Sequence, residues 1–99
     1  MNAIYNEVLV SYDIEDNKQR TKLHNELKDL GLLAIQKSVF WGHLNRAEEN
    51  AVRRLFKQYC RQGDKAFVAR IKLAAQIKLN SFGYSPEEIP LKPVDYYVV

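Results

Sequence analysis

The chain has 99 residues, enough for one domain over residues 1–99 but not for a second hydrophobic core. Its 46% hydrophobic and 11% aromatic content is typical of a packed globular protein and excludes a largely disordered chain. The net charge is +3, and residues 37–78 carry the positive excess, with 10 Lys or Arg against 3 Asp or Glu. This block predicts either a surface for phosphate backbones or a solvated helix face.

The chain contains one cysteine, Cys60, so no disulfide can form within it. A lone cysteine suits a reducing, cytoplasmic setting. No stretch approaches the ~20 apolar residues that span a bilayer, and the first residues lack the pattern of a signal peptide. We therefore expect a soluble cytoplasmic protein with no membrane partner.

The first predicted elements are a strand over Val8–Tyr12 and a helix that follows it. The strand is rich in β-branched and aromatic residues. Asp16 can cap the helix, with Gln19 in the capping-box position, and Gly31 can end it in a left-handed conformation. The helix has one apolar face at i, i+4 and i+7, formed by Leu23, Leu27 and Leu30.

Strand character returns over Leu32–Leu44, as one kinked strand or two short ones, with Gly42 at a bulge or tight bend. Asn45 and Glu48 then form the capping box of a second helix, which Gly63 ends. Its inward face comprises Ala51, Val52, Leu55, Phe56 and Tyr59. Residues 66–71 (AFVARI) form the next strand.

This order of elements predicts an α+β fold, the ferredoxin-like βαββαβ sandwich, with a core over about residues 7–72. The tail, residues 73–99, contains a proline-rich loop at 81–93 and a further C-terminal strand at 95–99 (DYYVV). Two helices cover only one face of the sheet. Because the strands carry apolar residues on both sides, we expect a second copy to cover the other face, making a homodimer.

Asp13, at the end of the first strand, is the strongest candidate for chemistry. A single carboxylate is a poor metal site, because Mg²⁺ takes one or two carboxylates together with waters and phosphates. Two copies of Asp13 that meet across a dimer axis could share one ion, which would activate water and stabilise charge on a phosphodiester. The alternative is that Asp13 only caps the following turn or helix.

Other polar and aromatic residues have two interpretations each. Ser38 reaches a phosphate or hydrogen-bonds the backbone at a bulge, and Arg20 reaches a phosphate beside Asp13 or pairs with Glu15 or Asp16. Of the adjacent Phe40 and Trp41, one is expected in the core, and the other could stack on a base or cover the dimer seam. His24 and His43 are too far apart in sequence for a metal motif. His24 is expected at the surface, and His43, near the Gln36–Gly42 phrase, could touch substrate.

The second helix carries a broad basic surface. Arg53, Lys57 and Arg61 are spaced i, i+4 and i+8, so they form one stripe along it. Such a stripe predicts contact with a nucleic-acid backbone without regard to sequence.

Two segments together resemble the Cas2 family of CRISPR-associated proteins: VSYDIEDNKQRTKL and LKDLGLLAIQKSVFWGHL. The family has a strand ending in Tyr-Asp, a helix with an arginine and a leucine face, a glycine, and a Gln-x-Ser-Val-Phe-x-Gly phrase. The matching residues are Tyr12, Asp13, Arg20, Leu23, Leu27, Gly31, Gln36, Ser38, Val39, Phe40 and Gly42. The resemblance covers about residues 7–72. Trp41 departs from it, because many members have an acidic residue there, and the tail matches no phrase of the family.

The resemblance implies a homodimer in which two Asp13 carboxylates face each other and bind a divalent metal, Mg²⁺ or Mn²⁺. It implies a metal-dependent endonuclease acting on RNA or DNA, with Asp13 as catalytic and metal-binding residue. It also implies a place in spacer acquisition, where the dimer bridges Cas1 integrase dimers. The supporting residues implied by position are Tyr12, Arg20, Ser38 and Phe40.

Three functions therefore compete. The first is a metal-dependent endonuclease built on paired Asp13 residues. The second is a non-catalytic adaptor that holds double-stranded DNA on its basic surface in the integrase complex. The third is a toxin-like ribonuclease outside CRISPR immunity.

Overall fold

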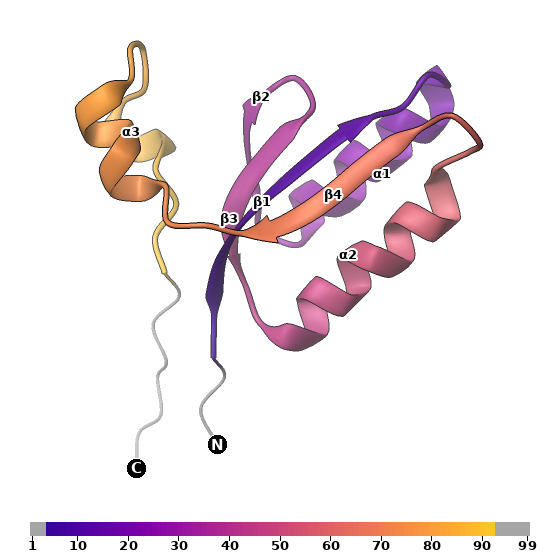
Figure 1. Cartoon of the computed structure of the whole chain (residues 1–99), viewed down its shortest axis with the longest axis horizontal. Helices are drawn as coiled ribbons and strands as arrows, with labels where there is room; N and C mark the ends of the chain where they lie inside the picture. Colours follow the sequence, from indigo (N-terminus) through magenta and orange to yellow (C-terminus); the bar gives the residue numbers. More distant parts are fainter. Residues whose placement is uncertain (1–3, 93–99) are drawn as a thin grey trace.

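The computed structural model describes residues 4–92 and forms a two-layer α+β sandwich (Figure 1). In chain order its elements are β1 (Asn6–Asp13), α1 (Asn17–Asp29), β2 (Leu33–Gln36), β3 (Val39–Leu44), α2 (Arg46–Tyr59), β4 (Lys65–Arg70), α3 (Ala74–Asn80) and the 3₁₀ turn η1 (Pro86–Glu88). The sheet is antiparallel, in the order β2-β3-β1-β4. This arrangement confirms the ferredoxin-like prediction, whereas the expected strand at 95–99 lies outside the described residues.

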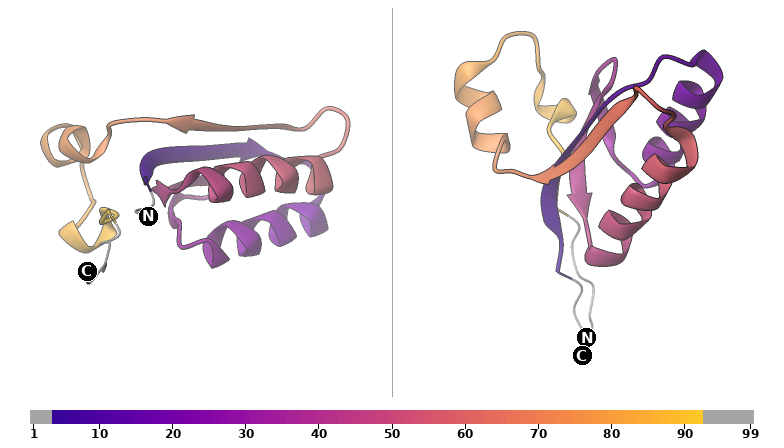
Figure 2. Two further views of the ribbon diagram at one scale, coloured as in Figure 1. Left: turned by 90° about the horizontal axis from the view of Figure 1, so that it is seen from below. Right: turned by 45° about the vertical axis from the view of Figure 1, so that its right-hand side comes forward.

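Helices α1 and α2 cover one face of the sheet, and the segment with α3 and η1 lies beyond its end (Figure 2). The core lies between the helices and the sheet. Alternate residues of β1 point into it, where they meet the leucine face of α1 and Val52 of α2. Its fully buried side chains include Val8, Val10, Leu23, Leu27, Phe40, Leu44 and Val52. None of the helices within residues 4–92 has the length and apolar character needed to cross a membrane.

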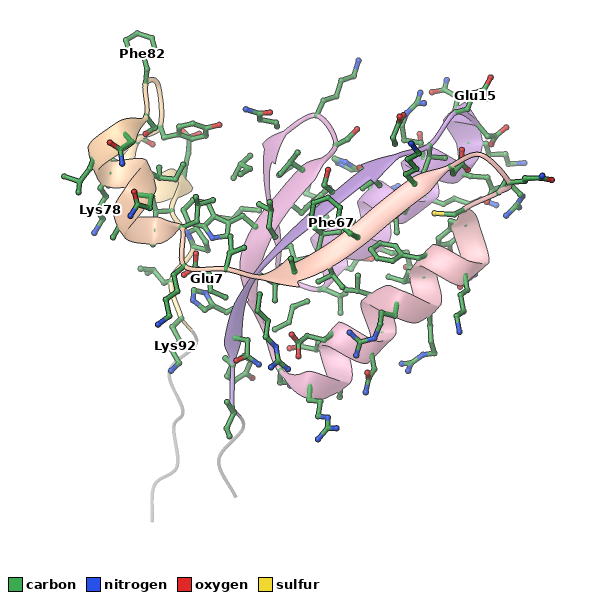
Figure 3. The ribbon with its side chains drawn as sticks, viewed as in Figure 1. Glu7, Glu15, Phe67, Lys78, Phe82 and Lys92 are labelled. Carbon is green, nitrogen blue, oxygen red and sulfur yellow. The ribbon has the colours of Figure 1, made fainter. Side chains whose placement is uncertain are left out.

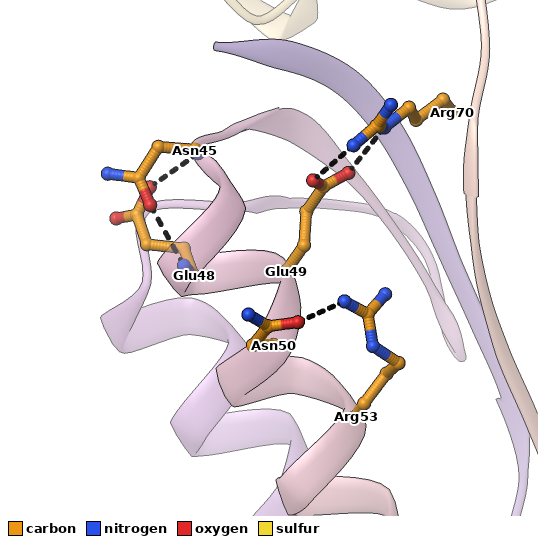
Figure 4. A network of polar contacts seen from close by, with 6 residues as sticks. All are labelled: Asn45, Glu48, Glu49, Asn50, Arg53 and Arg70. Carbon is orange, nitrogen blue, oxygen red and sulfur yellow. Dashed lines mark hydrogen bonds and ion pairs between the residues drawn. The ribbon is translucent and has the colours of Figure 1, made fainter. Parts of the chain in front are cut away.

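Both long helices begin where the capping residues predict. The Asp16 carboxylate accepts a hydrogen bond from the Gln19 N–H at 2.8 Å. Asn45 and Glu48 form a complete capping box, each side chain accepting from the other's backbone N–H at 2.9 Å (Figure 4). These bonds satisfy N–H groups that the first turn of a helix leaves unpaired.

Gly42 does not lie at a bulge or a bend, so that prediction is wrong. It pairs regularly with Val8, and the irregular register lies in β2, between Ala34 and Gln36. A Cβ atom at Gly42 would lie 2.7 Å from Cδ2 of Leu32. A side chain at this position would force the buried Leu32 side chain to shift, so close packing rather than backbone conformation favours the glycine.

Two further boundaries differ from the sequence prediction. Helix α2 ends at Tyr59 rather than at Gly63, because the Arg61 N–H bonds to the Asp64 carboxylate at 2.8 Å and starts a turn in which Gly63 has a φ of +91°. The tail contains the short helix α3, which was not predicted because no capping residue precedes it. The region 32–44 resolves into two strands joined by a hairpin.

A bidentate ion pair joins the start of α2 to the end of β4 (Figure 4). The Arg70 guanidinium donates to the Glu49 carboxylate, with Nε–Oε2 at 2.9 Å and Nη2–Oε1 at 3.0 Å. Glu49 is 4% exposed, whereas the Arg70 side chain is 63% exposed. The hydrogen bonds from Arg70 hold the pKa of Glu49 below its ordinary value of 4.5.

We predict that Glu49→Gln lowers the free energy of unfolding by roughly 1–2 kcal/mol at neutral pH, since the partly solvated ion pair is lost. Because the pKa of Glu49 is depressed in the folded state, the pair stabilises the fold fully above the unfolded pKa. Its contribution disappears as pH falls below about 4.5 and through the folded value. Urea unfolding of both proteins from pH 7 to pH 3 should show the difference shrinking with acid. A constant difference across that range would contradict the assignment.

Candidate functional site

Asp13 is the last residue of β1, and its side chain is exposed. Side chains of a strand alternate between the two faces of a sheet. Val8, Val10 and Tyr12 point toward the helices, so Ser11 and Asp13 belong to the open face. β1 pairs with β3 as far as Ser11 and with β4 as far as Asp13, so the backbone of Asp13 is held by β4.

The sheet register places Lys65, the first residue of β4, directly opposite Asp13. Cross-strand neighbours have Cβ atoms about 4.5–5.5 Å apart and lie on the same face. Within residues 4–92 no cation lies within 4.0 Å of the Asp13 carboxylate, so Lys65 is a neighbour that does not neutralise it. Sequence reasoning missed Lys65, because only the strand register joins two residues so far apart along the chain.

Arg20 fixes the loop between β1 and α1. Its guanidinium donates to the carbonyl oxygen of Ile14 at 2.8 Å and of Glu15 at 3.4 Å, and to the side chain of Asn17. Pairing with the carboxylate of Glu15 or Asp16 is not found in the described part of the chain. Arg20 therefore acts on the backbone that immediately follows Asp13.

Tyr12 and Ser38 connect the end of β1 to the β2–β3 hairpin. The Tyr12 N–H donates to the backbone carbonyl of Ser38 at 3.1 Å. This bond does not involve the Ser38 hydroxyl, so both interpretations of that hydroxyl stay predictions. The Tyr12 ring stacks on Phe40, with centroids 6.3 Å apart, and burial raises the pKa of Tyr12. These contacts support the strand end from the core side.

Neither Phe40 nor Trp41 offers an exposed ring, because both are completely buried. Phe40 lies in the core, where the His24 ring meets it edge-on at 5.0 Å, so this histidine is half-buried rather than fully at the surface. Trp41 lies on the open-face side of β3 and donates from Nε1 to Glu7 at 2.9 Å. With Trp41 buried, neither ring is available to stack on a base, and the alternative that one covers a dimer seam stays a prediction.

Asp64 ties the loop after α2 to the loop after β1. Its carboxylate accepts hydrogen bonds from the N–H groups of Arg61, at 2.8 Å, and Glu15, at 3.1 Å. These two bonds lower the pKa of Asp64. They place the end of α2 beside the loop that carries Asp13.

The basic stripe, defined as Arg53, Lys57 and Arg61, is exposed. Arg53 and Lys57 lie on α2, but Arg61 lies beyond its last residue, Tyr59, so the predicted helical spacing does not extend to Arg61. Its last member, Arg61, lies next to the Asp13 end of the sheet through the Asp64 contact. The stripe and Asp13 are on different layers of the sandwich, but they converge at this one end of the molecule.

The residues around Asp13 fit a divalent metal only in part. Carboxylate oxygens are the ligands that Mg²⁺ prefers. Within residues 4–92, no group of three or more His, Cys, Asp or Glu residues could hold a metal ion. Asp13 thus has the right donor chemistry, but one chain supplies one carboxylate.

Comparison with known proteins supplies the family. The family model described as CRISPR associated protein Cas2 matches residues 6–76. The chain belongs to the Cas2 family. This confirms the resemblance carried by the Tyr12-Asp13 strand end and the Gln36–Gly42 phrase.

Two relatives of the Cas2 family match most of the chain. A protein of Francisella tularensis subsp. novicida, named CRISPR-associated endoribonuclease Cas2 1, is 49% identical over 78 residues, which is 79% of this chain and 80% of the relative. A CRISPR-associated endoribonuclease Cas2 of Korarchaeum cryptofilum is 41% identical over 85 residues, covering 80% of this chain and 91% of the relative.

Two solved structures share the fold. A crystal structure described as cas2 is 21% identical and has a TM-score of 0.63. The match covers 96% of this chain and 100% of that chain. A hypothetical protein from Thermus thermophilus is 29% identical with a TM-score of 0.61, covering 70% of this chain and 84% of that chain.

Proposed function

We propose that this Cas2-family chain is a metal-dependent endoribonuclease of CRISPR immunity that acts as a homodimer, with Asp13 as its catalytic carboxylate. The observation that carries the proposal is the exposed Asp13 at the rigid end of β1, on the open sheet face and with no cation within 4.0 Å in the described part of the chain. The names of its relatives support RNA as the substrate. Family membership also favours CRISPR immunity over a toxin-like ribonuclease outside it.

The homodimer is supported by the apolar side chains that remain on the open face. Phe67 of β4 is 51% exposed and pairs in register with Ser11, two residues before Asp13. Leu33 of β2 is 36% exposed. A second copy packed face to face would cover Phe67, and a two-fold axis near this end would bring the two Asp13 carboxylates together.

The pair of Asp13 residues would hold Mg²⁺ or Mn²⁺, which supplies a site for activating water and for stabilising negative charge on phosphate. The remaining groups of the chain position the reaction. Arg20 and Asp64 hold the loop after Asp13, and the Lys65 ammonium adds positive charge beside the scissile phosphate. The basic stripe binds the backbone on either side of the cut.

A second function, a DNA-binding adaptor in spacer acquisition, is favoured by the same basic stripe. Four cationic side chains are exposed on α2, and a fifth follows just beyond its end: Arg46, Arg53, Arg54 and Lys57, then Arg61. They lie on the helix layer, outside the sheet face that carries Asp13, so a duplex could bind them without reaching the carboxylate. In this role the dimer bridges Cas1 integrase dimers, and Asp13 is dispensable.

We predict that Asp13→Ala lowers the rate of Mg²⁺-dependent cleavage of single-stranded RNA by roughly 100-fold or more, because the metal-binding carboxylate is removed. Cleavage is measured on end-labelled RNA with Mg²⁺, with Mn²⁺ and with a chelator. Asp29→Asn, an exposed carboxylate at the far end of α1, is the matched control and should cleave as the wild type does. Equal cleavage by the Asp13 variant would exclude the nuclease assignment.

We predict that Arg53→Gln and Lys57→Gln each weaken binding of a DNA duplex and reduce the slope of log K against log salt by about 1, because each removes one phosphate contact. Binding is measured by fluorescence anisotropy between 50 and 200 mM salt. Lys78→Gln on α3 makes the same charge change away from the stripe and should leave the slope unaltered. An unchanged slope in the stripe variants would place the duplex elsewhere.

A further inference from the structure

A surface pocket lies at the end of the sheet opposite Asp13. It has a volume of about 460 Å³ and is formed where β1 begins and where β3 and β4 end. Glu7 and Asp13 are six residues apart on β1, which separates the two ends by roughly 20 Å. The lining side chains that matter here are Tyr5, Glu7, His43, Arg70, Lys72 and Lys92.

The pocket contains three cations and one carboxylate. Arg70 is already engaged by Glu49 through two hydrogen bonds. Within residues 4–92, no carboxylate lies within 4.0 Å of the ammonium groups of Lys72 and Lys92, and both lysines are exposed. Figure 3 shows Lys92 and Glu7 at the same end of the sheet, on segments far apart in the sequence. Among the described residues, Lys72 and Lys92 are therefore the two cations of this pocket that no carboxylate pairs.

The carboxylate in the pocket, that of Glu7, already accepts hydrogen bonds from other residues of the chain. Oε2 of Glu7 accepts hydrogen bonds from Nε1 of Trp41, at 2.9 Å, and from the N–H of Leu73, at 2.7 Å. These bonds hold the chain that leaves β4 against the start of β1. Glu7 therefore forms part of the pocket wall, and two hydrogen-bond donors stabilise its negative charge.

His43 is the remaining polar group. Its Nδ1 atom is buried and has no hydrogen-bond partner in the described part of the chain. A buried polar atom without a partner is unfavourable, and a small turn of the imidazole toward a ligand in the pocket would satisfy it. The half-buried ring of Tyr5 lies in the same wall and can contact a base.

We propose that this pocket binds the phosphate monoester of a nucleotide. A phosphate monoester carries a charge of about −1.5 to −2 at neutral pH, and it is attracted by the net +1 that Lys72, Lys92 and Glu7 leave once Arg70 is paired with Glu49. Lys72 and Lys92 bind the phosphate, His43 supplies a further hydrogen bond, and Tyr5 contacts the base. The proposal does not depend on Asp13, so it stands or fails separately from the nuclease.

The ligand has two possible sources, a free mononucleotide or the phosphorylated end of a nucleic-acid strand. The probes are adenosine 5′-monophosphate, a short RNA with a 5′-phosphate, and the same RNA with a 5′-hydroxyl. The readout is the nitrogen NMR spectrum of the imidazoles of the full chain. The chain has 2 histidines, and His24, packed on Phe40, is the internal control.

The expected result is a saturable shift of the His43 nitrogens with the phosphorylated probes and none at His24. Lys72→Ala and Lys92→Ala each weaken that binding roughly tenfold, as expected for one charge-assisted contact, whereas Lys78→Ala on α3 does not. Tighter binding of the phosphorylated RNA than of the mononucleotide identifies the strand end as the ligand, and the reverse identifies the free nucleotide.

Three results would overturn the proposal. They are an unresponsive His43, equal binding of the 5′-hydroxyl RNA, and equal weakening by Lys78→Ala. All three lysines are exposed, so these variants are expected to fold, and a circular dichroism melt of each verifies it.

Discussion

Strand β1 is hydrogen-bonded along both edges, to β3 and to β4, and the rest of the structure depends on that double pairing. A shift of one residue would move every side chain of the strand to the opposite face. The burial of Val8, Val10 and Tyr12 against the helices opposes such a shift. The same alternation leaves Glu7 and Asp13 on the open side, at opposite ends of one rigid element. One strand thus positions both of the polar sites proposed for this molecule.

The loops at the Asp13 end are held by charge-assisted hydrogen bonds to the backbone. Arg20 donates to the carbonyls that follow the strand, and Asp64 accepts from N–H groups of two different loops. Such bonds are stronger than those between neutral groups, and they leave the Asp13 carboxylate itself free. A site that is rigid but not neutralised is what a shared metal would require. Because Arg20 and Asp64 bond to backbone groups, they do not form ion pairs with each other in the described part of the chain.

The sequence predicted the parts of the fold that local signals control. Asp16 and Asn45 cap their helices because capping needs only a side chain and the first turn, and Asp13 ends its strand as expected. Gly42 was misread because its requirement comes from Leu32, a contact that no local pattern records. Lys65 and the pocket near Lys92 depend on strand register and on the path of the tail. The sequence left open whether the Trp41 ring is exposed. The ring is buried, and the sequence could not predict this because tertiary contacts decide which rings are covered.

The central claim is that two Asp13 carboxylates share one metal across a two-fold axis. The most direct test is a crystal of the protein soaked in Mn²⁺ and measured for anomalous scattering. We predict one peak on the axis, between the paired Asp13 side chains of two subunits. A dimer with these carboxylates on opposite outer surfaces, or an axis without any peak, would contradict the account.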